Sequence, residues 1–140
     1  MRKLYKIFSV LLLAFNMLGA FYGGTSLILY PDGSDIQLDL NFLEHSPFKN
    51  YLIPGIILFC VNGLFSAFVL WQVVMNKRHA AKLIIVQGIL LTGWILIQIM
   101  LIRSVFGLHF IMGGTGLSLI AFGCLQYNGV KKIKVTKHKT

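Results

Sequence analysis

The chain has 140 residues, of which 56% are hydrophobic and only 12% are charged, and its mean hydropathy is +0.77. A soluble domain normally carries about twice that charged fraction, so the composition excludes an ordinary soluble protein and indicates that lipid is the main solvent. The formal net charge of +9 would suit nucleic acid, but the basic residues border apolar runs instead of lining one amphipathic face, so we expect no nucleic-acid partner.

Four apolar runs are long enough to cross a bilayer. A helix rises about 1.5 Å per residue and the hydrocarbon core is about 30 Å thick, so a span needs roughly 20 apolar residues. Backbone polar groups in lipid must be satisfied within each span, which favours helices throughout. The first run is too long for the apolar part of a secretory signal and has no good cleavage site, so we expect it to be retained. The predicted spans are about 7–29, 52–75, 83–102 and 105–128.

Small and polar residues repeat at helical spacing in every span, which predicts faces where helices pack closely. In the second span, Gly55, Asn62 and Ser66 share one such face. The corresponding residues are Asn16, Gly19, Gly23, Ser26 and Tyr30 in the first span; Gln87, Leu91, Trp94 and Gln98, with a second stripe of Gly88, Thr92, Ile95 and Ile99, in the third; and His109, Gly113, Gly116, Ile120, Gly123 and Tyr127 in the fourth.

The loop at residues 30–51 holds every acidic residue of the chain. Pro31 and Gly33 predict a sharp turn where the chain leaves the membrane. The apolar residues that follow alternate as in a strand, yet Ser34 and Gln37 have capping-box spacing, and we favour a short interfacial helix or a compact lid. The acids could collect Ca²⁺, but their spacing matches no calcium loop, so we expect a solvated acidic surface. They are Asp32, Asp35, Asp39 and Glu44.

The basic residues predict the orientation. Eleven of the thirteen lie in three clusters, within residues 2–6, 77–82 and 131–139. A four-span path puts all three clusters on one side, and the positive-inside rule makes that side cytoplasmic. We therefore predict an all-α membrane protein of one domain, an antiparallel four-helix transmembrane bundle with one longer extracytoplasmic loop and both termini cytoplasmic. The basic tail at 129–140 either marks topology alone or also holds anionic lipids, at roughly 1 kcal/mol per lysine.

Two segments carry a resemblance. The run GGTSLILYPDGS and the run SPFKNYLIPG, which follows some dozen residues later, lie within residues 19–66. Together they resemble a group of small four-span bacterial membrane proteins without an assigned activity, and the later spans match that group in spacing and apolarity. The resemblance implies the same architecture and a bacterial plasma-membrane location, and it transfers no catalytic or binding residue.

Sequence signatures of catalysis are missing. The chain has no HExxH, GxSxG, P-loop or GxGxxG motif, and no Asp or Glu lies in a predicted span, where it would indicate proton coupling or ion transport. Cys60 and Cys124 have neither CxxC nor Cys/His zinc spacing, so they predict two small buried hydrophobic side chains and no disulfide. We expect no catalytic residue, no metal site and no cofactor.

One set of polar residues is left as a candidate ligand site in the outer half of the bundle. By helical rise, those inside the spans lie between roughly 7 and 15 Å below the outer ends. They could converge beneath the lid as an outward-facing pocket, since polar groups facing lipid are costly, or they could make ordinary interhelical hydrogen bonds. The candidates are Tyr22, Asn62, Gln98, Arg103 and His109.

These features predict a non-catalytic membrane protein, either an accessory subunit with a protein partner or a second copy of itself, or a module that binds lipid or a small molecule. One alternative is a small transporter or channel acting as an oligomer, which would need a polar path to the cytoplasmic face. Another is an outer-leaflet enzyme using His109 and Arg103, helped by Glu44 or His45 of the lid.

Overall fold

The computed structural model describes residues 1–138, and within this range the chain is helical without strands. Four helices are long and apolar enough to cross a membrane. The first is α1 (Arg2–Leu29); the second spans Leu52–Val74 and is assembled from α2 (Leu52–Ile57), the π-helical η3 (Leu58–Leu64) and α3 (Phe65–Val74); the third and fourth are α4 (Ala80–Ile102) and α5 (Gly107–Lys137). The predicted all-α class is confirmed, and so is the presence of four helices long and apolar enough to span a membrane.

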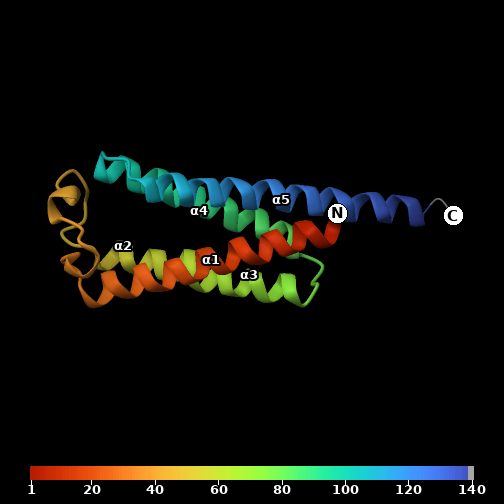
Figure 1. The fold of residues 1–140 in the computed structure, drawn as a ribbon, viewed down its shortest axis with the longest axis horizontal. Coiled ribbons are helices and arrows are strands. Elements are labelled where there is room, and N and C mark those ends of the chain that lie inside the picture. The colour runs from red at the N-terminus through yellow and green to blue at the C-terminus, as the bar shows by residue number, and fades with distance from the viewer. Residues whose placement is uncertain (139–140) are drawn as a thin grey trace.

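The helix ends gather at two ends of an elongated molecule (Figure 1). One end holds the N-terminus, the connection between α3 and α4, and the C-terminal part of α5, which extends beyond the other helices. The opposite end holds residues 30–51 and the short connection between α4 and α5. We call these the basic end and the lid end. The predicted tail begins within α5, and its residues 139–140 lie outside the described range.

The first span packs closely on the second through glycines. A side chain at Gly24 would lie 2.9 Å from the backbone nitrogen of Phe59, and one at Gly63 would meet the ring of Phe21 at 2.8 Å. The contact face predicted for α1 needs correction, because Gly24 is the buried glycine, whereas Gly19 is exposed and a Cβ added there would meet no atom within 4 Å. Asn16 and Ser26 of the predicted stripe are buried and Gly23 is half-buried, so the contact face keeps part of that stripe. Ala20, Gly24 and Leu27 belong to the face in place of Gly19 and Tyr30.

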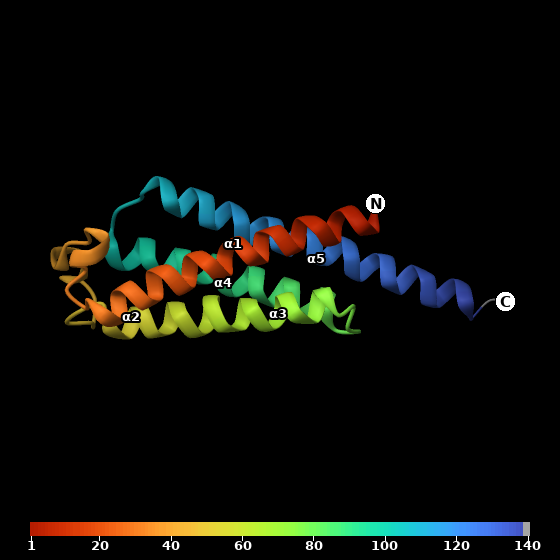
Figure 2. The same cartoon turned by 60° about the horizontal axis from the view of Figure 1, so that its bottom comes forward.

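The third and fourth spans form a second glycine-packed pair, through residues of the faces that the sequence predicted. Gly88 of α4 lies against the backbone of α5, where a Cβ would be 2.7 Å from the oxygen of Gly116 and 2.8 Å from the nitrogen of Ile120. Farther along α5, Gly123 packs on Ile85 in the same way. In Figure 2, α4 and α5 lie apart at the short connection and come together toward the basic end.

Apolar side chains join the two pairs in the half nearer the basic end. Leu13, Val69, Ile84 and Leu119 come from four different helices, and none of them has exposed surface. Cys60 and Cys124 are free and exposed on the helix surfaces, so the expectation that both are buried is wrong. Each points outward from its helix, where lipid would cover it.

Residues 30–51 fold into a compact lid with two short 3₁₀ turns, η1 (Ser34–Ile36) and η2 (Leu40–Leu43). Tyr51 ties it together, because its backbone N–H donates to the Pro31 carbonyl at 2.8 Å and its hydroxyl donates to the Asp39 carbonyl at 2.6 Å. Its ring packs with Leu27 and Leu43.

The capping box expected in the lid does not form. Gln37 has a left-handed φ of +55° and follows the turn, whereas the hydroxyl and N–H of Ser34 donate back to the Asp32 carboxylate. These hydrogen bonds lower the pKa of Asp32 from its ordinary value. A local turn held by a carboxylate therefore replaces the first turn of a longer helix.

Candidate functional site

The five residues predicted to line an outward-facing pocket are spread over different surroundings. Tyr22 is 68% exposed on the surface of α1, Asn62 is fully buried in η3, and Gln98 is half-buried on α4. Within residues 1–138, no hydrogen bond or ring contact joins any two of the five, which include Arg103 and His109.

Arg103 and His109 stabilise the helix ends on either side of the α4–α5 connection. Arg103 adopts a left-handed φ of +53° just after α4, and its backbone N–H donates to the Ile99 carbonyl at 2.9 Å, which ends the helix. His109 begins α5, where its Nδ1 accepts the N–H of Phe106 at 2.9 Å. Because Nδ1 must be unprotonated to accept this bond, a neutral His109 caps the helix.

The acidic lid offers no cluster for a metal. Within the described chain, no group of three or more His, Cys, Asp or Glu side chains is arranged to hold an ion. Asp39 accepts from the backbone and side chain of Asn41, and Asp32 accepts from Ser34, so two carboxylates are engaged in the turns of the lid. Burial, and then the nearby charge of Asp39, raise the pKa of Tyr51 above its ordinary value, which keeps its hydroxyl a donor.

The basic end contains the better-formed site, and it begins with the way α3 stops. Asn76 has a left-handed φ of +52°, its N–H donates to the Val73 carbonyl, and the N–H of Lys77 donates to the Gln72 carbonyl. This pattern is a Schellman motif with Asn76 in the position usually taken by glycine. It turns the chain out of the helix and presents the Asn76 side chain toward α1.

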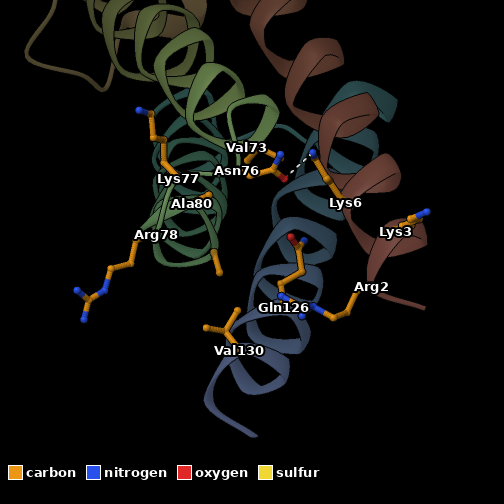
Figure 3. Close-up of a pocket in the computed structure, with 11 residues that line it drawn as sticks. Arg2, Lys3, Lys6, Val73, Asn76, Lys77, Arg78, Ala80, Gln126 and Val130 are labelled. Atoms are coloured by element: carbon orange, nitrogen blue, oxygen red, sulfur yellow. Dashed lines mark hydrogen bonds between the residues drawn. The ribbon is translucent and has the colours of Figure 1, made fainter. Parts of the chain in front are cut away.

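Helix α1 supplies the second side of the site. The ammonium of Lys6 donates to Asn76 Oδ1 at 2.8 Å, which joins the start of the first span to the end of the second. Figure 3 shows this bond, with Arg2 extending from α1 toward Gln126. Gln126 of α5 is itself fixed, since its Nε2 donates to Ser9 Oγ at 2.8 Å.

These elements enclose a surface pocket of about 520 Å³, within the size range of small-ligand sites. Figure 3 shows Lys6 and Arg2 beside the space, while the charged ends of Lys3 and Arg78 point away from it. We call it the basic pocket; its five basic residues are Arg2, Lys3, Lys6, Lys77 and Arg78.

Within residues 1–138, no acidic side chain lies near the charges of this pocket. All four acidic residues of the sequence lie between positions 32 and 44, in the lid at the opposite end of the molecule. Lys77 lies over the ring of Trp71 at 5.8 Å, a cation–π contact that leaves its positive charge in place. Uncompensated positive charge drawn from separate elements is an arrangement that attracts anions.

A second pocket, of about 410 Å³, adjoins the first and shares Lys3 and Lys6 with it. The rest of its lining is apolar and runs along α1, from Ile7 to Val10 and Leu11. A charged recess therefore continues into an apolar strip on the outer surface of the helix. An amphiphile with an anionic head and a hydrocarbon chain would match this surface, with its head in the charged recess and its chain along the apolar strip.

Comparison of the chain with protein-family models, with curated proteins and with solved structures gives no match. The geometry of the two ends is therefore the basis for a functional assignment.

In the sequence, the basic clusters are signals of orientation only. Residues of the first two clusters line one pocket, and this depends on features that a linear pattern does not reveal, namely the Schellman turn at Asn76 and the side of α1 on which Lys6 lies. The sequence does contain one indication of this site. In a chain of four spans, the span ends that carry the Lys and Arg clusters lie at the same end of the bundle.

Proposed function

We propose that the protein is a non-catalytic integral membrane protein that binds an anionic phospholipid at the basic pocket. In this proposal the four helices form an antiparallel bundle in a bacterial plasma membrane, with the termini and the basic pocket on the cytoplasmic side and the acidic lid outside. The bound lipid is a structural or regulatory ligand of this protein or of a complex to which it belongs.

The main support for this proposal is that five basic residues, from α1 and the α3–α4 connection, line one pocket. Every acidic side chain of the sequence lies at the other end of the molecule. A basic residue near an anionic membrane surface contributes roughly 1 kcal/mol of attraction. Arg2 and Lys6, which lie beside the space, would together give about 2 kcal/mol before salt screening, which reduces interactions beyond a Debye length of about 8 Å at physiological ionic strength.

The positive-inside bias supports the same orientation. Eleven of the thirteen basic residues of the sequence belong to the three clusters. The members of these clusters within residues 1–138 lie at the basic end, whereas Lys49 and Arg103 lie at the lid end. Cytoplasmic loops carry such an excess of Lys and Arg. The pocket would then face the leaflet in which anionic lipid headgroups attract basic segments.

The apolar strip favours a lipid over a free phosphate compound. A phosphate bound by Lys6 and Arg2 would leave its attached glycerol and acyl chains beside Ile7, Val10 and Leu11, which line the adjoining pocket. Burial of hydrocarbon against this strip would add affinity that inorganic phosphate or a nucleotide could not gain.

Native mass spectrometry of the purified protein, with phosphatidylglycerol, phosphatidylcholine or inorganic phosphate added, tests the proposal. We expect phosphatidylglycerol to be retained most strongly and its retention to fall as salt rises. The double variant Arg2→Gln/Lys6→Gln should lose about 2 kcal/mol of binding free energy, a weakening of roughly 30-fold.

The matched control removes the same amount of charge from the other end. Lys49→Gln/Arg103→Gln should bind phosphatidylglycerol as tightly as the unmodified chain, since both residues are exposed at the lid end. Equal retention of phosphatidylcholine, or equal weakening by the two double variants, would contradict a lipid site in the basic pocket. Retention of inorganic phosphate at the same strength would assign the pocket to free anions instead.

A further inference from the structure

A second polar site lies inside the bundle, away from the basic pocket. It joins Asn16 of α1, Asn62 of η3, Ser66 of α3 and Gln87 of α4, and none of the four has exposed surface. Asn16 Nδ2 donates to Ser66 Oγ at 2.7 Å and to the Asn62 carbonyl at 3.4 Å. Gln87 Nε2 donates to Asn62 Oδ1 at 3.2 Å. We call these four residues the buried polar cluster.

The cluster has hydrogen-bonding capacity that its own members do not use. Asn16 Oδ1, Asn62 Nδ2 and Gln87 Oε1 are buried and have no hydrogen-bond partner within the described residues. Each belongs to an amide whose other atom is bonded within the cluster, and the two polar atoms of an amide are about 2.2 Å apart. Two of the three unpaired atoms are acceptors and one is a donor, and each lies one amide's width from an atom that is hydrogen-bonded within the cluster.

Rotating the side-chain amides does not remove this mismatch. If Asn62 and Gln87 were both turned by 180°, Asn62 Nδ2 would donate to Gln87 Oε1, and one oxygen and one nitrogen of the pair would again be unpaired. Two amides joined by a single hydrogen bond always leave one donor group and one acceptor group. The missing partner must both donate and accept.

The backbone around the cluster is shaped differently from the rest of the bundle. Residues Leu58–Leu64 form a π-helix, and its Asn62 carbonyl accepts from Asn16 on the neighbouring helix. Local π-helical turns widen a helix and are common at functional sites, and in membranes their freed backbone groups are satisfied by neighbouring side chains. The widened turn lies where the α1–α2 pair meets α4.

We infer that the buried polar cluster binds one internal water molecule, which donates to Asn16 Oδ1 and Gln87 Oε1 and accepts from Asn62 Nδ2. Internal waters typically make about three hydrogen bonds to buried polar groups, which is the number available here. A monovalent cation fits less well, because Asn62 Nδ2 would point a donor at it and the predicted spans contain no carboxylate. The water links three spanning helices in the interior of the membrane.

Magnetization transfer between water and the Asn62 side-chain amide, measured by NMR on the isotopically labelled full chain in micelles, tests this inference. We expect a cross-peak typical of a long-lived internal water in the unmodified protein. Gln87→Leu should abolish it by removing one ligand of the water. The control Gln98→Leu makes the same change on the same helix, at a half-buried glutamine outside the cluster, and should leave the cross-peak unchanged.

The unmodified protein decides the matter even if Gln87→Leu does not fold. Absence of the water cross-peak from the folded chain would overturn the inference, as would a crystal structure in which the three atoms are paired directly with protein groups. A shift of the Asn62 resonances when sodium replaces choline in the buffer would assign the site to a cation and also overturn it. None of these results depends on lipid binding at the basic pocket.

Discussion

The close packing of α4 on α5 makes a sharp prediction for Gly88→Ala. The added Cβ would lie 2.7 Å from the Gly116 oxygen, 2.7 Å from Ile120 Cγ1 and 2.8 Å from the Ile120 nitrogen. Two of these atoms belong to the backbone of α5, so relief of the clash requires the helices to separate. Overpacking of this kind typically costs about 1–3 kcal/mol.

An opposing effect must be subtracted, because alanine is the better helix former. Replacing a glycine in a helix interior by alanine gains roughly 0.5–1 kcal/mol. The expected net change for Gly88→Ala is therefore a destabilisation of about 0–2.5 kcal/mol. Gly93→Ala is the matched control on the same helix, since a Cβ at Gly93 meets no atom within 4 Å, and it should be neutral or slightly stabilising.

Reversible unfolding in mixed micelles, followed by circular dichroism over a range of denaturing detergent, measures both variants. Close contact at Gly88 requires Gly88→Ala to unfold at a lower concentration of denaturing detergent than Gly93→Ala. If Gly88→Ala is as stable as Gly93→Ala, the two helices are not in contact at Gly88 as described, and the α4–α5 pairing would have to be revised.

Three further predictions concern the lid end and the orientation. Tyr51→Phe should loosen the lid by about 1 kcal/mol and speed its proteolysis, since it removes the bond to the Asp39 carbonyl. Because the pKa of Tyr51 is raised in the folded lid, the hydroxyl contributes its full stabilisation of the lid below the ordinary pKa of 10.0, and this stabilisation is lost as the pH rises through the higher folded pKa. Proteolysis of the unmodified lid should therefore accelerate only in strong alkali. The lid of Tyr51→Phe should show no such acceleration. His109→Ala should destabilise the start of α5 by about 1 kcal/mol through the lost cap without changing lipid retention, and reduced retention would contradict the capping role. Alkaline phosphatase fused after Thr140 should be inactive and a fusion within the lid active, and the reverse pattern would refute the proposed orientation.

The sequence was sufficient for the helices because their apolar length is a property of the linear chain. Four runs of roughly 20 apolar residues predict four spans without any knowledge of their neighbours. The helix faces that pack against other helices were predicted better for the fourth span than for the first. In the fourth span the glycines at 116 and 123 stand alone at their positions, whereas in the first span Gly23 and Gly24 are adjacent, and only contact with Phe59 distinguishes them.

The predicted site shows what helical spacing leaves undetermined. Distance along a span gives the depth of Tyr22 or Gln98, but the direction in which each points around the helix depends on how the bundle packs. Tyr22 faces outward and Asn62 faces inward although both are polar residues of the spans. The π-helical turn at Asn62 adds a further rotation that no sequence pattern of period 3.6 contains.

Photo-crosslinking tests the central claim most directly. Anionic phospholipid carrying a photoreactive group next to its phosphate is incorporated into nanodiscs with the unmodified protein, and the crosslinked peptides are identified by mass spectrometry. Lipid binding at the basic pocket predicts crosslinks concentrated on the segments that contain Lys6 and Asn76, and their loss when excess unlabelled phosphatidylglycerol is present. Crosslinks concentrated on the lid near Lys49, or distributed evenly around all four helices, would contradict it.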